Sequence, residues 1–131
     1  MNIKMDHLAI WTSDLEKARA FYQKYFDMQC GARYYNPVKQ FSSYFLSFPQ
    51  GAVRLELMHR PDIANFIGKR GVATGLAHIA IAVGSKERVD VLTERLRSDG
   101  YVIEGEPRTT GDGYYESLIL DPEGNLIEIT E

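Results

Sequence analysis

The feature of this sequence that most constrains its fold is an internal repeat. The segment His7-Leu8-Ala9-Ile10 returns as His78-Ile79-Ala80-Ile81, 71 positions later (78 minus 7), and Leu55-Glu56-Leu57 returns as Ile127-Glu128-Ile129, 72 positions later (128 minus 56). A nearly constant offset across two polar residue types indicates two copies of one supersecondary unit. The chain is therefore predicted to consist of two halves with the same elements in the same order.

The first half has the pattern of a strand, a helix and three further strands. Alternating side chains predict the first strand over residues 5–12. The sequence Ser13-Asp14-Leu15-Glu16 has the form of a capping box with Ser13 as the capping residue, and the helical spacing of apolar residues continues to about Phe26. Three more strands are predicted over residues 29–35, 42–48 and 52–58, with a loop at 36–40 and a turn at 49–51.

The second half repeats this pattern. Strands are predicted over residues 76–83, 101–104, 114–120 and 125–130, with a turn at 121–124. The helix between the first two strands is capped by Ser85 and ended by Gly100, where a left-handed conformation is expected. We expect one α+β domain over residues 1–131, with a first βαβββ module at about 1–59, a linker at about 60–75 and a second module at about 76–131.

Four ionisable side chains lie at repeat-equivalent positions on otherwise apolar strands, namely His7, Glu56, His78 and Glu128. Because successive residues of a strand point to opposite faces, all four point away from the face that packs on the helix. A buried carboxylate without a partner would cost roughly several kcal/mol, and two would repel each other. One divalent cation removes both costs. Two imidazoles and two carboxylates suit zinc, nickel, cobalt, manganese or iron(II) better than calcium.

Each of the four also has a plainer interpretation. A single histidine on an apolar strand is usually a hydrogen-bonded structural residue, and a single glutamate there usually faces solvent. Four such residues at equivalent positions of a repeat would require four separate coincidences, so metal binding is the better interpretation. His59 is predicted not to be a ligand, because it lies on the opposite strand face from Glu56 and has no counterpart in the second half.

Composition excludes several other classes of protein. The chain carries 15 Lys and Arg against 18 Asp and Glu, interspersed, which is not the charge pattern of a nucleic-acid-binding surface. It has one cysteine and no apolar run that approaches the ~20 residues of a membrane span. We expect a cytoplasmic protein with a small-molecule substrate and no nucleic-acid or membrane partner.

The sequence resembles the vicinal oxygen chelate superfamily, the group of glyoxalase I, bleomycin-resistance proteins and extradiol dioxygenases. The resemblance covers essentially the whole chain. It depends on H-L-A-I followed by D-L-E-K-A-R-A-F-Y, on L-E-L in mid-chain, on H-I-A-I-A-V, and on D-P-E-G-N-L-I-E-I at the end. It implies two βαβββ modules that curl into a half-barrel cup around a metal ion, and a homodimer. In glyoxalase I each site takes one ligand pair from each subunit, which here pairs His7 and Glu56 with His78 and Glu128 of the other chain.

The resemblance also implies an activity. His-Glu-His-Glu is the ligand pattern of glyoxalase I, so a lactoylglutathione lyase-like lyase or isomerase is expected, acting on a small α-oxo or hemithioacetal substrate through an enediolate. The metal polarises the carbonyl, and a carboxylate moves the proton of the neighbouring carbon. Glu128, by analogy with glyoxalase I, and then Glu56 are the candidates for this base.

Three further residues are candidates for the substrate pocket. Trp11 shares the strand face of His7, and Arg54 shares that of Glu56, where it binds an anionic substrate or forms a salt bridge at the rim of the sheet. Tyr115 follows a glycine-rich segment, residues 111–115, that forms either a lid or an ordinary turn.

The chain departs from glutathione-using bacterial glyoxalases at two positions. Those enzymes tend to carry Arg four residues after the first histidine and Asn four residues after the first glutamate, where this chain has Trp11 and Arg60. The departures argue against glutathione as the thiol. The alternatives are a metabolite- or antibiotic-binding protein of the same fold, favoured by loss of the ligands, and an iron-dependent extradiol dioxygenase, which carries no glutamate at the position of Glu56.

Overall fold

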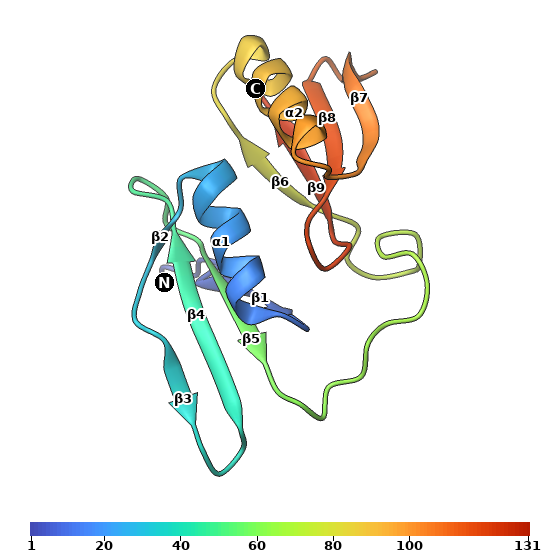
Figure 1. Ribbon diagram of the computed structural model, residues 1–131. Helices are drawn as coiled ribbons and strands as arrows, with labels where there is room; N and C mark the ends of the chain where they lie inside the picture. The colour runs from blue at the N-terminus through green and yellow to red at the C-terminus, as the bar shows by residue number, and fades with distance from the viewer. The chain divides into compact units, whose positions relative to one another are not determined.

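The computed structural model describes all residues of the chain, 1–131, and shows two compact units, Met1–Phe66 and Ile67–Glu131. Each unit contains one helix and one mixed sheet (Figure 1). The predicted α+β class with two βαβββ-like modules is therefore confirmed. Neither α-helix has the length and apolar composition that a membrane span requires.

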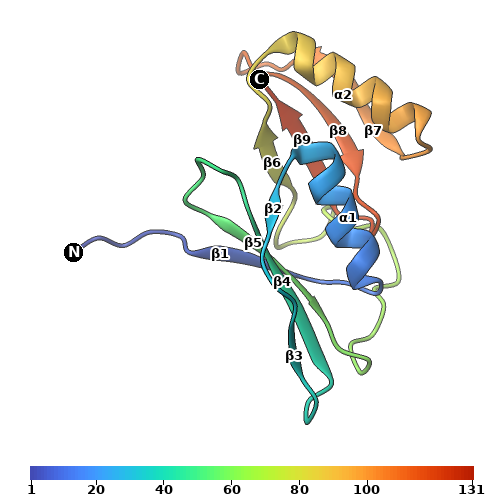
Figure 2. The same cartoon turned by 60° about the vertical axis from the view of Figure 1, so that its left-hand side comes forward.

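The first unit is built from five strands and one helix. In chain order they are β1 (His7–Trp11), α1 (Leu15–Phe26), β2 (Gln29–Cys30), β3 (Tyr34–Asn36), β4 (Phe41–Ser47) and β5 (Arg54–His59). The strand order is β1-β5-β4-β2, and β3 also pairs with β4. Only β1 and β5 are parallel; the remaining pairs are antiparallel. The β3–β4 hairpin extends beyond the N-terminal end of α1 (Figure 2).

The second unit repeats this topology. Its elements are β6 (Ile79–Ala82), α2 (Lys86–Ser98), β7 (Ile103–Thr109), β8 (Tyr115–Leu120) and β9 (Leu126–Thr130). The strand order is β6-β9-β8-β7, again with a parallel pair, β6 and β9, followed by antiparallel neighbours. The internal repeat of the sequence is therefore a repeat of strand pairing as well as of element order.

The prediction of one continuous strand over residues 29–35 is wrong. That segment forms β2 and β3, which pair with the two ends of β4 and are separated by residues 31–33. Three residues here face only two residues of β4, Tyr44 and Phe45, so one extra residue interrupts the pairing as in a β-bulge. The predicted strand over 101–104 is also too short, because β7 continues to Thr109 through two irregularities in its register.

The two helices begin with different kinds of cap. The cap of α1 is Asp14 and not Ser13, because the Asp14 carboxylate accepts a hydrogen bond from the backbone N–H of Lys17 at 3.1 Å. The predicted cap of α2 is confirmed, since the Ser85 hydroxyl accepts from the backbone N–H of Arg88 at 3.2 Å. Both oxygens satisfy an N–H that has no partner within the helix.

The helix α2 ends before Gly100, as predicted from the glycine. Gly100 has φ 89, a left-handed conformation that a residue without Cβ adopts at little cost. The backbone N–H of Gly100 donates to Arg97 O, and that of Tyr101 donates to Leu96 O. This pair of hydrogen bonds is a Schellman motif, and it turns the chain from α2 toward β7.

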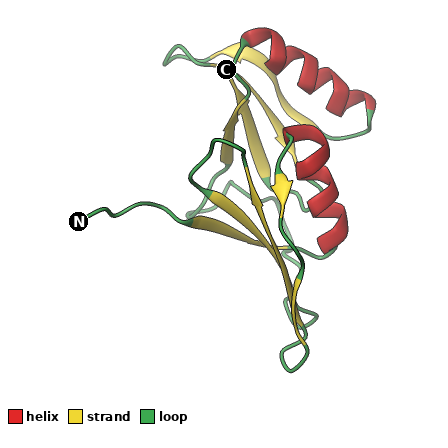
Figure 3. Cartoon of the chain, turned by 90° about the vertical axis from the view of Figure 1, so that its left-hand side faces the viewer, coloured by secondary structure: helices red, strands yellow, loops and turns green.

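In each unit the helix covers one face of its own sheet (Figure 3). Side chains from the helix and from alternate strand positions are buried there, at about 1.5–3 kcal/mol for each large apolar side chain. The core of the first unit contains aromatic residues of α1, whereas that of the second is aliphatic and includes two hydroxyl groups. The most deeply buried are Phe21, Tyr22, Leu46 and Leu57 in the first unit, and Val89, Thr93, Leu96, Ser117, Ile119, Ile127 and Ile129 in the second.

Candidate functional site

We call the face of each sheet that is not covered by its own helix the open face. In the first unit the open face carries His7 and Glu56. The parallel register opposes Ala9 to Glu56 and His7 to Arg54, so the histidine lies diagonally from the glutamate on the neighbouring strand. Their side chains meet, with His7 Nε2 at 3.6 Å from Glu56 Oε1.

The second unit has the same arrangement. Glu128 of β9 is opposed by Ala80 of β6, and His78 lies two residues before Ala80, directly before β6 begins. His78 Nε2 is 3.1 Å from Glu128 Oε2. The repeat therefore places one histidine and one glutamate in the same relative position in both units, with an alanine opposite each glutamate.

Exposure separates the two kinds of residue in each pair. The imidazoles of His7 and His78 are 37% and 40% exposed, whereas the carboxylates of Glu56 and Glu128 are 15% and 19% exposed. The glutamates are more covered because they lie in strands that have a neighbour on each side, whereas the histidines are at or just before the start of an edge strand. A mostly covered carboxylate beside an accessible nitrogen is a suitable donor pair for a cation.

His7 contacts Asp6 and Phe45, and Arg54 contacts both of these residues. Asp6 Oδ2 lies 2.7 Å from His7 Nδ1 and also accepts a hydrogen bond from the Arg54 guanidinium at 2.7 Å. The His7 ring contacts the edge of the Phe45 ring at a centroid distance of 5.2 Å, and the Arg54 guanidinium lies 4.2 Å from the centre of that ring. The hydrogen bonds from His7 and Arg54 hold the pKa of Asp6 below its ordinary value.

A third carboxyl group, Glu116, lies on the open face of the second unit. Leu118 of β8 is opposed by Glu128, so Glu116, two residues away, points to the same side. Its Oε2 atom is buried without a hydrogen-bond partner. A hydrogen bond with the Glu128 carboxyl and burial together raise the pKa of Glu116 to about 7.

Sequence reasoning missed both Glu116 and Asp6. Glu116 could have been found by counting outward from the 121–124 turn, which opposes Leu120 to Leu126 and so brings Leu118 opposite Glu128. Asp6 gave no such signal. A residue adjacent to His7 within a strand would point to the opposite face, and Asp6 reaches His7 because it precedes the first residue of β1.

The three predicted pocket residues have different surroundings. Trp11 lies on the open face beyond His7 and Ala9, is 38% exposed, and contacts Phe41 edge to face. The Arg60 guanidinium lies 5.4 Å from the centre of the Trp11 ring. Arg54 is on the same face but is bound to Asp6, which agrees with the salt-bridge alternative for that residue.

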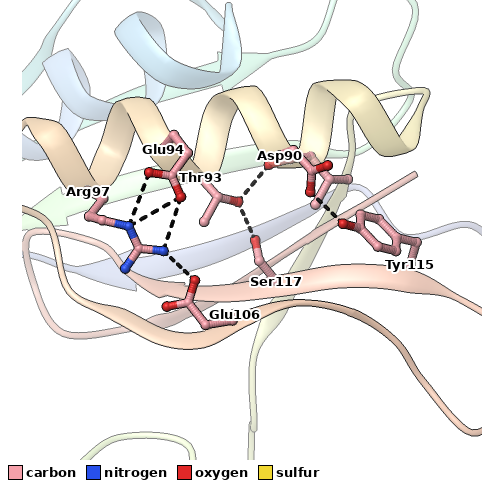
Figure 4. Close-up of polar contacts among 8 residues, drawn as sticks. Asp90, Thr93, Glu94, Arg97, Glu106, Tyr115 and Ser117 are labelled. Atoms are coloured by element: carbon pink, nitrogen blue, oxygen red, sulfur yellow. Dashed lines mark hydrogen bonds and ion pairs between the residues drawn. The ribbon is translucent and has the colours of Figure 1, made fainter.

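Tyr115 is on the opposite side of its sheet. Figure 4 shows it directed at α2, where its hydroxyl donates to Asp90 at 2.5 Å. It shares that side with Ser117, whose hydroxyl meets Thr93 of α2 in the core. The structure therefore does not bring Tyr115 to Glu128. The segment before it forms a turn in which Gly113 has φ 90 and donates to Thr110 O.

His59 lies where the strand pattern predicted. It is opposed by Ser42 of β4 and shares the side of Leu55 and Leu57, which pack toward α1. It is consequently separated from Glu56 by the thickness of the strand, although the two residues are only three positions apart in the sequence.

The donors are of the type that binds a transition metal, and they come as two pairs. No group of three or more His, Cys, Asp or Glu side chains that could hold a metal ion is present. Zinc and related ions in proteins take four donors, or three together with a water or substrate. The two imidazoles and two carboxylates together fit that requirement in number and chemistry, whereas either pair alone is too few.

Comparison with known proteins gives these features a family context. The profile of the Glyoxalase/Bleomycin resistance protein/Dioxygenase superfamily matches residues 4–129. The chain is 28% identical over 128 residues to the uncharacterized protein YqjT of Bacillus subtilis (strain 168), covering 95% of this chain and 96% of that protein. It is also 28% identical over 135 residues to mitochondrial methylmalonyl-CoA epimerase of Bos taurus, covering 98% and 74%.

Solved structures show the same fold. Glyoxalase I from Zea mays superposes with a TM-score of 0.79 at 25% identity over 97% of this chain, which spans only 44% of the maize chain. A glyoxylase/bleomycin resistance protein/dioxygenase domain from Frankia sp. EAN1pec superposes with a TM-score of 0.81 at 18% identity, covering 99% and 98%. With its repeated topology and a superfamily profile that matches nearly its full length, the chain belongs to the glyoxalase/bleomycin resistance protein/dioxygenase superfamily.

Proposed function

We propose that this protein is a divalent-metal-dependent lyase or isomerase that moves a proton at a carbon next to a carbonyl group. The observation that carries the proposal is the equivalent placement of His7 with Glu56 and of His78 with Glu128 on the open faces of the two units. The superfamily supports it, because many of its members are metal-dependent enzymes.

The proposed site takes all four residues around one cation, with zinc, nickel or cobalt preferred and manganese or iron(II) acceptable. Residues 1–131 would then act as one functional domain, since neither unit alone supplies enough donors. A homodimer in which His7 and Glu56 of one subunit meet His78 and Glu128 of the partner is the proposed assembly, by analogy with glyoxalase I. A two-fold arrangement builds two identical sites of this kind.

The two carboxylates have the chemistry for the proton transfer. When bound, the metal supplies a positive charge that polarises the substrate carbonyl and makes the neighbouring C–H more acidic. Glu128 takes that proton and returns it to the same or the adjacent carbon, which is general acid–base catalysis. Glu56 is the second candidate for the same role. His7 and His78 act as neutral nitrogen donors that hold the site together.

The likeness to two kinds of named enzyme supports a proposal for the substrate class. The chain resembles glyoxalase I in structure and methylmalonyl-CoA epimerase in sequence. The substrate we propose is a small α-oxo compound, its hemithioacetal with a thiol, or a thioester with an acidic C–H beside the carbonyl. Glutathione is disfavoured, because Trp11 and the Arg60 side chain near its ring occupy the two positions at which the sequence departs from glutathione-using enzymes.

Metal content is the first test. The purified protein should retain about one transition metal ion per chain, and both His7→Ala and His78→Ala should lose it, because each removes one of four donors. His59→Ala is the matched control and should keep the metal, since its side chain lies on the helix side of β5. Retention by the two ligand variants, measured by elemental analysis after dialysis, would refute the site.

Turnover is the second test. The metal-loaded protein should convert methylglyoxal in the presence of a suitable thiol, or exchange the acidic proton of a methylmalonyl thioester for deuterium. The His7→Ala variant is the negative control for both assays. A protein that binds metal and these compounds but turns over none of them would favour the binding-protein alternative.

A further inference from the structure

The two halves of the proposed site differ behind their histidines. In the first unit, Asp6 Oδ2 lies 2.7 Å from His7 Nδ1 and accepts a second hydrogen bond from Arg54 at the same distance. In the second unit the residue before His78 is Ala77, which has no polar side chain, and the position of Arg54 is taken by Leu126. Only the first histidine has a carboxylate behind it.

The contact with Asp6 determines which nitrogen of His7 carries the proton. An ionised carboxylate can only accept hydrogen bonds, so a contact at 2.7 Å requires a proton on Nδ1. Glu56 competes for a proton on Nε2, but its oxygen is 3.6 Å away, which is beyond hydrogen-bond length. The shorter contact is the stronger one, and neutral His7 then presents the lone pair of Nε2 toward Glu56.

From this geometry we infer that Asp6 is a positioning residue. It holds the His7 imidazole with the proton on Nδ1, so that Nε2 is ready to donate to a metal on the open face beside Glu56. The functional role of Asp6 depends on the proposed metal site. The position of the proton on His7 can be measured without any metal. Carboxylate–histidine–metal arrangements fix ring orientation and raise the basicity of the ligand.

Arg54 and Phe45 hold Asp6 and His7 in place. Arg54 is tied to Asp6 twice, through its guanidinium and through its backbone N–H, which donates to Asp6 O at 3.1 Å. The guanidinium also lies over the Phe45 ring, and the His7 imidazole meets the same ring edge to face. Asp6 is itself exposed, so without these contacts its carboxylate would be free to turn into solvent.

Nitrogen-15 NMR of the metal-free full-length protein tests the proton position. Spectra are recorded at about pH 9, well above the ordinary histidine pKa of about 6.5, so that the two neutral forms of an imidazole are compared. We expect His7 to show its proton on Nδ1 in the wild type and to move to the Nε2–H form in Asp6→Ala. Asp6→Asn keeps an acceptor oxygen and should retain the Nδ1–H form. His78 should be unchanged in every variant.

Metal affinity gives the second readout. Asp6→Ala should bind cobalt(II) about tenfold more weakly than the wild type, in the range usual for partners of metal ligands. Asp6→Asn should recover most of that loss. Asp62→Ala is the matched control, because Asp62 is also an exposed aspartate bound by an arginine, Arg60, but touches no histidine. It should leave cobalt affinity and the His7 proton unchanged.

The outcomes separate this inference from the proposed function. A wild-type His7 with its proton on Nε2, or an Asp6→Ala variant with unchanged spectrum, overturns the role of Asp6 whatever the metal does. If His7→Ala binds cobalt as well as the wild type, the metal site is wrong, while the proton position still reports on Asp6. An Asp6→Ala variant with the altered proton position but full cobalt affinity shows that Asp6 does not serve the metal and also overturns the inference.

Discussion

Glu56 and Glu128 occupy equivalent positions, yet their neighbours on the adjacent strand differ. Glu128 shares its face with the carboxyl of Glu116, whereas the position equivalent to Glu116 in the first unit is Ser43. The hydrogen bond with Glu128, together with burial, raises the pKa of Glu116. This difference agrees with a division of roles in which Glu128 accepts and returns the substrate proton, whereas Glu56 serves as a metal ligand.

The division of roles predicts that Glu128→Gln lowers turnover far more than metal affinity. Glutamine keeps an oxygen near the metal but cannot accept a proton, and general base catalysis typically contributes ~10²–10⁴-fold. Glu56→Gln is the matched control and should be milder in turnover. The measurement is kcat for an identified substrate beside metal affinity for both variants. Near-normal turnover in Glu128→Gln would show that Glu128 is only a structural ligand, and Glu56 would become the candidate for the base.

The raised pKa of Glu116 predicts a pH dependence of stability in the metal-free protein. The pKa of Glu116 is about 7 in the folded state against an ordinary value of 4.5. Between these values the native state holds a proton that the unfolded chain has lost, so the free energy of unfolding decreases as the pH rises through this window. In Glu116→Gln this decrease should be absent, and the variant should be more stable than the wild type at pH values above the window.

Urea unfolding at several pH values checks the prediction for Glu116. The control is Glu87→Gln, which removes the same charge from an exposed position in the first turn of α2. Its pH profile should run parallel to that of the wild type. If the profile of Glu116→Gln also runs parallel to that of the wild type, the pKa of Glu116 is not raised in the folded protein.

In both units a hydrogen bond from a tyrosine of the sheet to a carboxylate of the helix holds the helix on its sheet, in addition to apolar packing. In each unit a tyrosine of the strand before the last, β4 or β8, donates to a carboxylate of the helix: Tyr44 to Glu16 at 2.6 Å, and Tyr115 to Asp90 at 2.5 Å. A cation of each helix also lies near the tyrosine ring. The hydrogen bond to Asp90 explains why Tyr115, which the sequence suggested as a substrate-binding residue, is directed at the helix.

The core of the second unit adds a buried hydroxyl pair. The Thr93 hydroxyl donates to Val89 O at 2.6 Å, so its one hydrogen is used, and Ser117 must be the donor in the 2.8 Å contact between the two side chains. Both residues are buried, at 0% and 2% exposure. Thr93→Val removes the acceptor of the Ser117 hydroxyl, whereas Ser117→Ala leaves the bond of Thr93 to Val89 intact.

We therefore expect Thr93→Val to lower the free energy of unfolding by about 1–3 kcal/mol, the cost of a buried polar group without a partner. Ser117→Ala should cost less, and adding Ser117→Ala to Thr93→Val should recover part of the loss. The three variants form a double-mutant cycle that is measured by chemical denaturation. Additive losses would show that the two hydroxyls act independently.

At the scale of the whole molecule, the proposed homodimer can be tested by mixing inactive variants. If each site takes His7 from one subunit and His78 from its partner, a heterodimer of His7→Ala and His78→Ala contains one intact site and one that has lost both histidines. Refolding the two variants together should then restore about one quarter of wild-type metal binding, because half of the dimers in a random mixture are heterodimers with one of two sites intact.

Each variant refolded alone is the control and should bind no metal. If a single chain supplies all four ligands, every site in the mixture lacks a histidine, and mixing restores nothing. The absence of complementation in protein that is shown to exchange subunits would therefore exclude the shared site while leaving the four-ligand site intact.

Much of the fold could be predicted because it depends on local and repeating signals. Apolar alternation and helical spacing are properties of short segments, and the offset between His7 and His78 relates the two halves without any knowledge of their packing. Ser85 and Gly100 were predicted as helix ends because capping depends on a few adjacent residues. Two predictions were wrong. Ser13 is not the cap, because the hydrogen bond to the Lys17 N–H comes from Asp14. Residues 29–35 do not form one strand, because their pairing with β4 is interrupted.

The sequence by itself determined the two modules, the strand faces and the four candidate ligands, since side-chain direction in a strand follows from its period of two. The tertiary structure decided which residues meet across strands. Asp6 reaches His7 because it lies outside β1 and is held by Arg54 of the neighbouring strand, and Glu116 meets Glu128 through the register of the β8–β9 hairpin. The period of two along one strand does not specify contacts of this kind, because they depend on how neighbouring strands pair; for Glu116 that register follows from the 121–124 turn, and for Asp6 no turn indicates it.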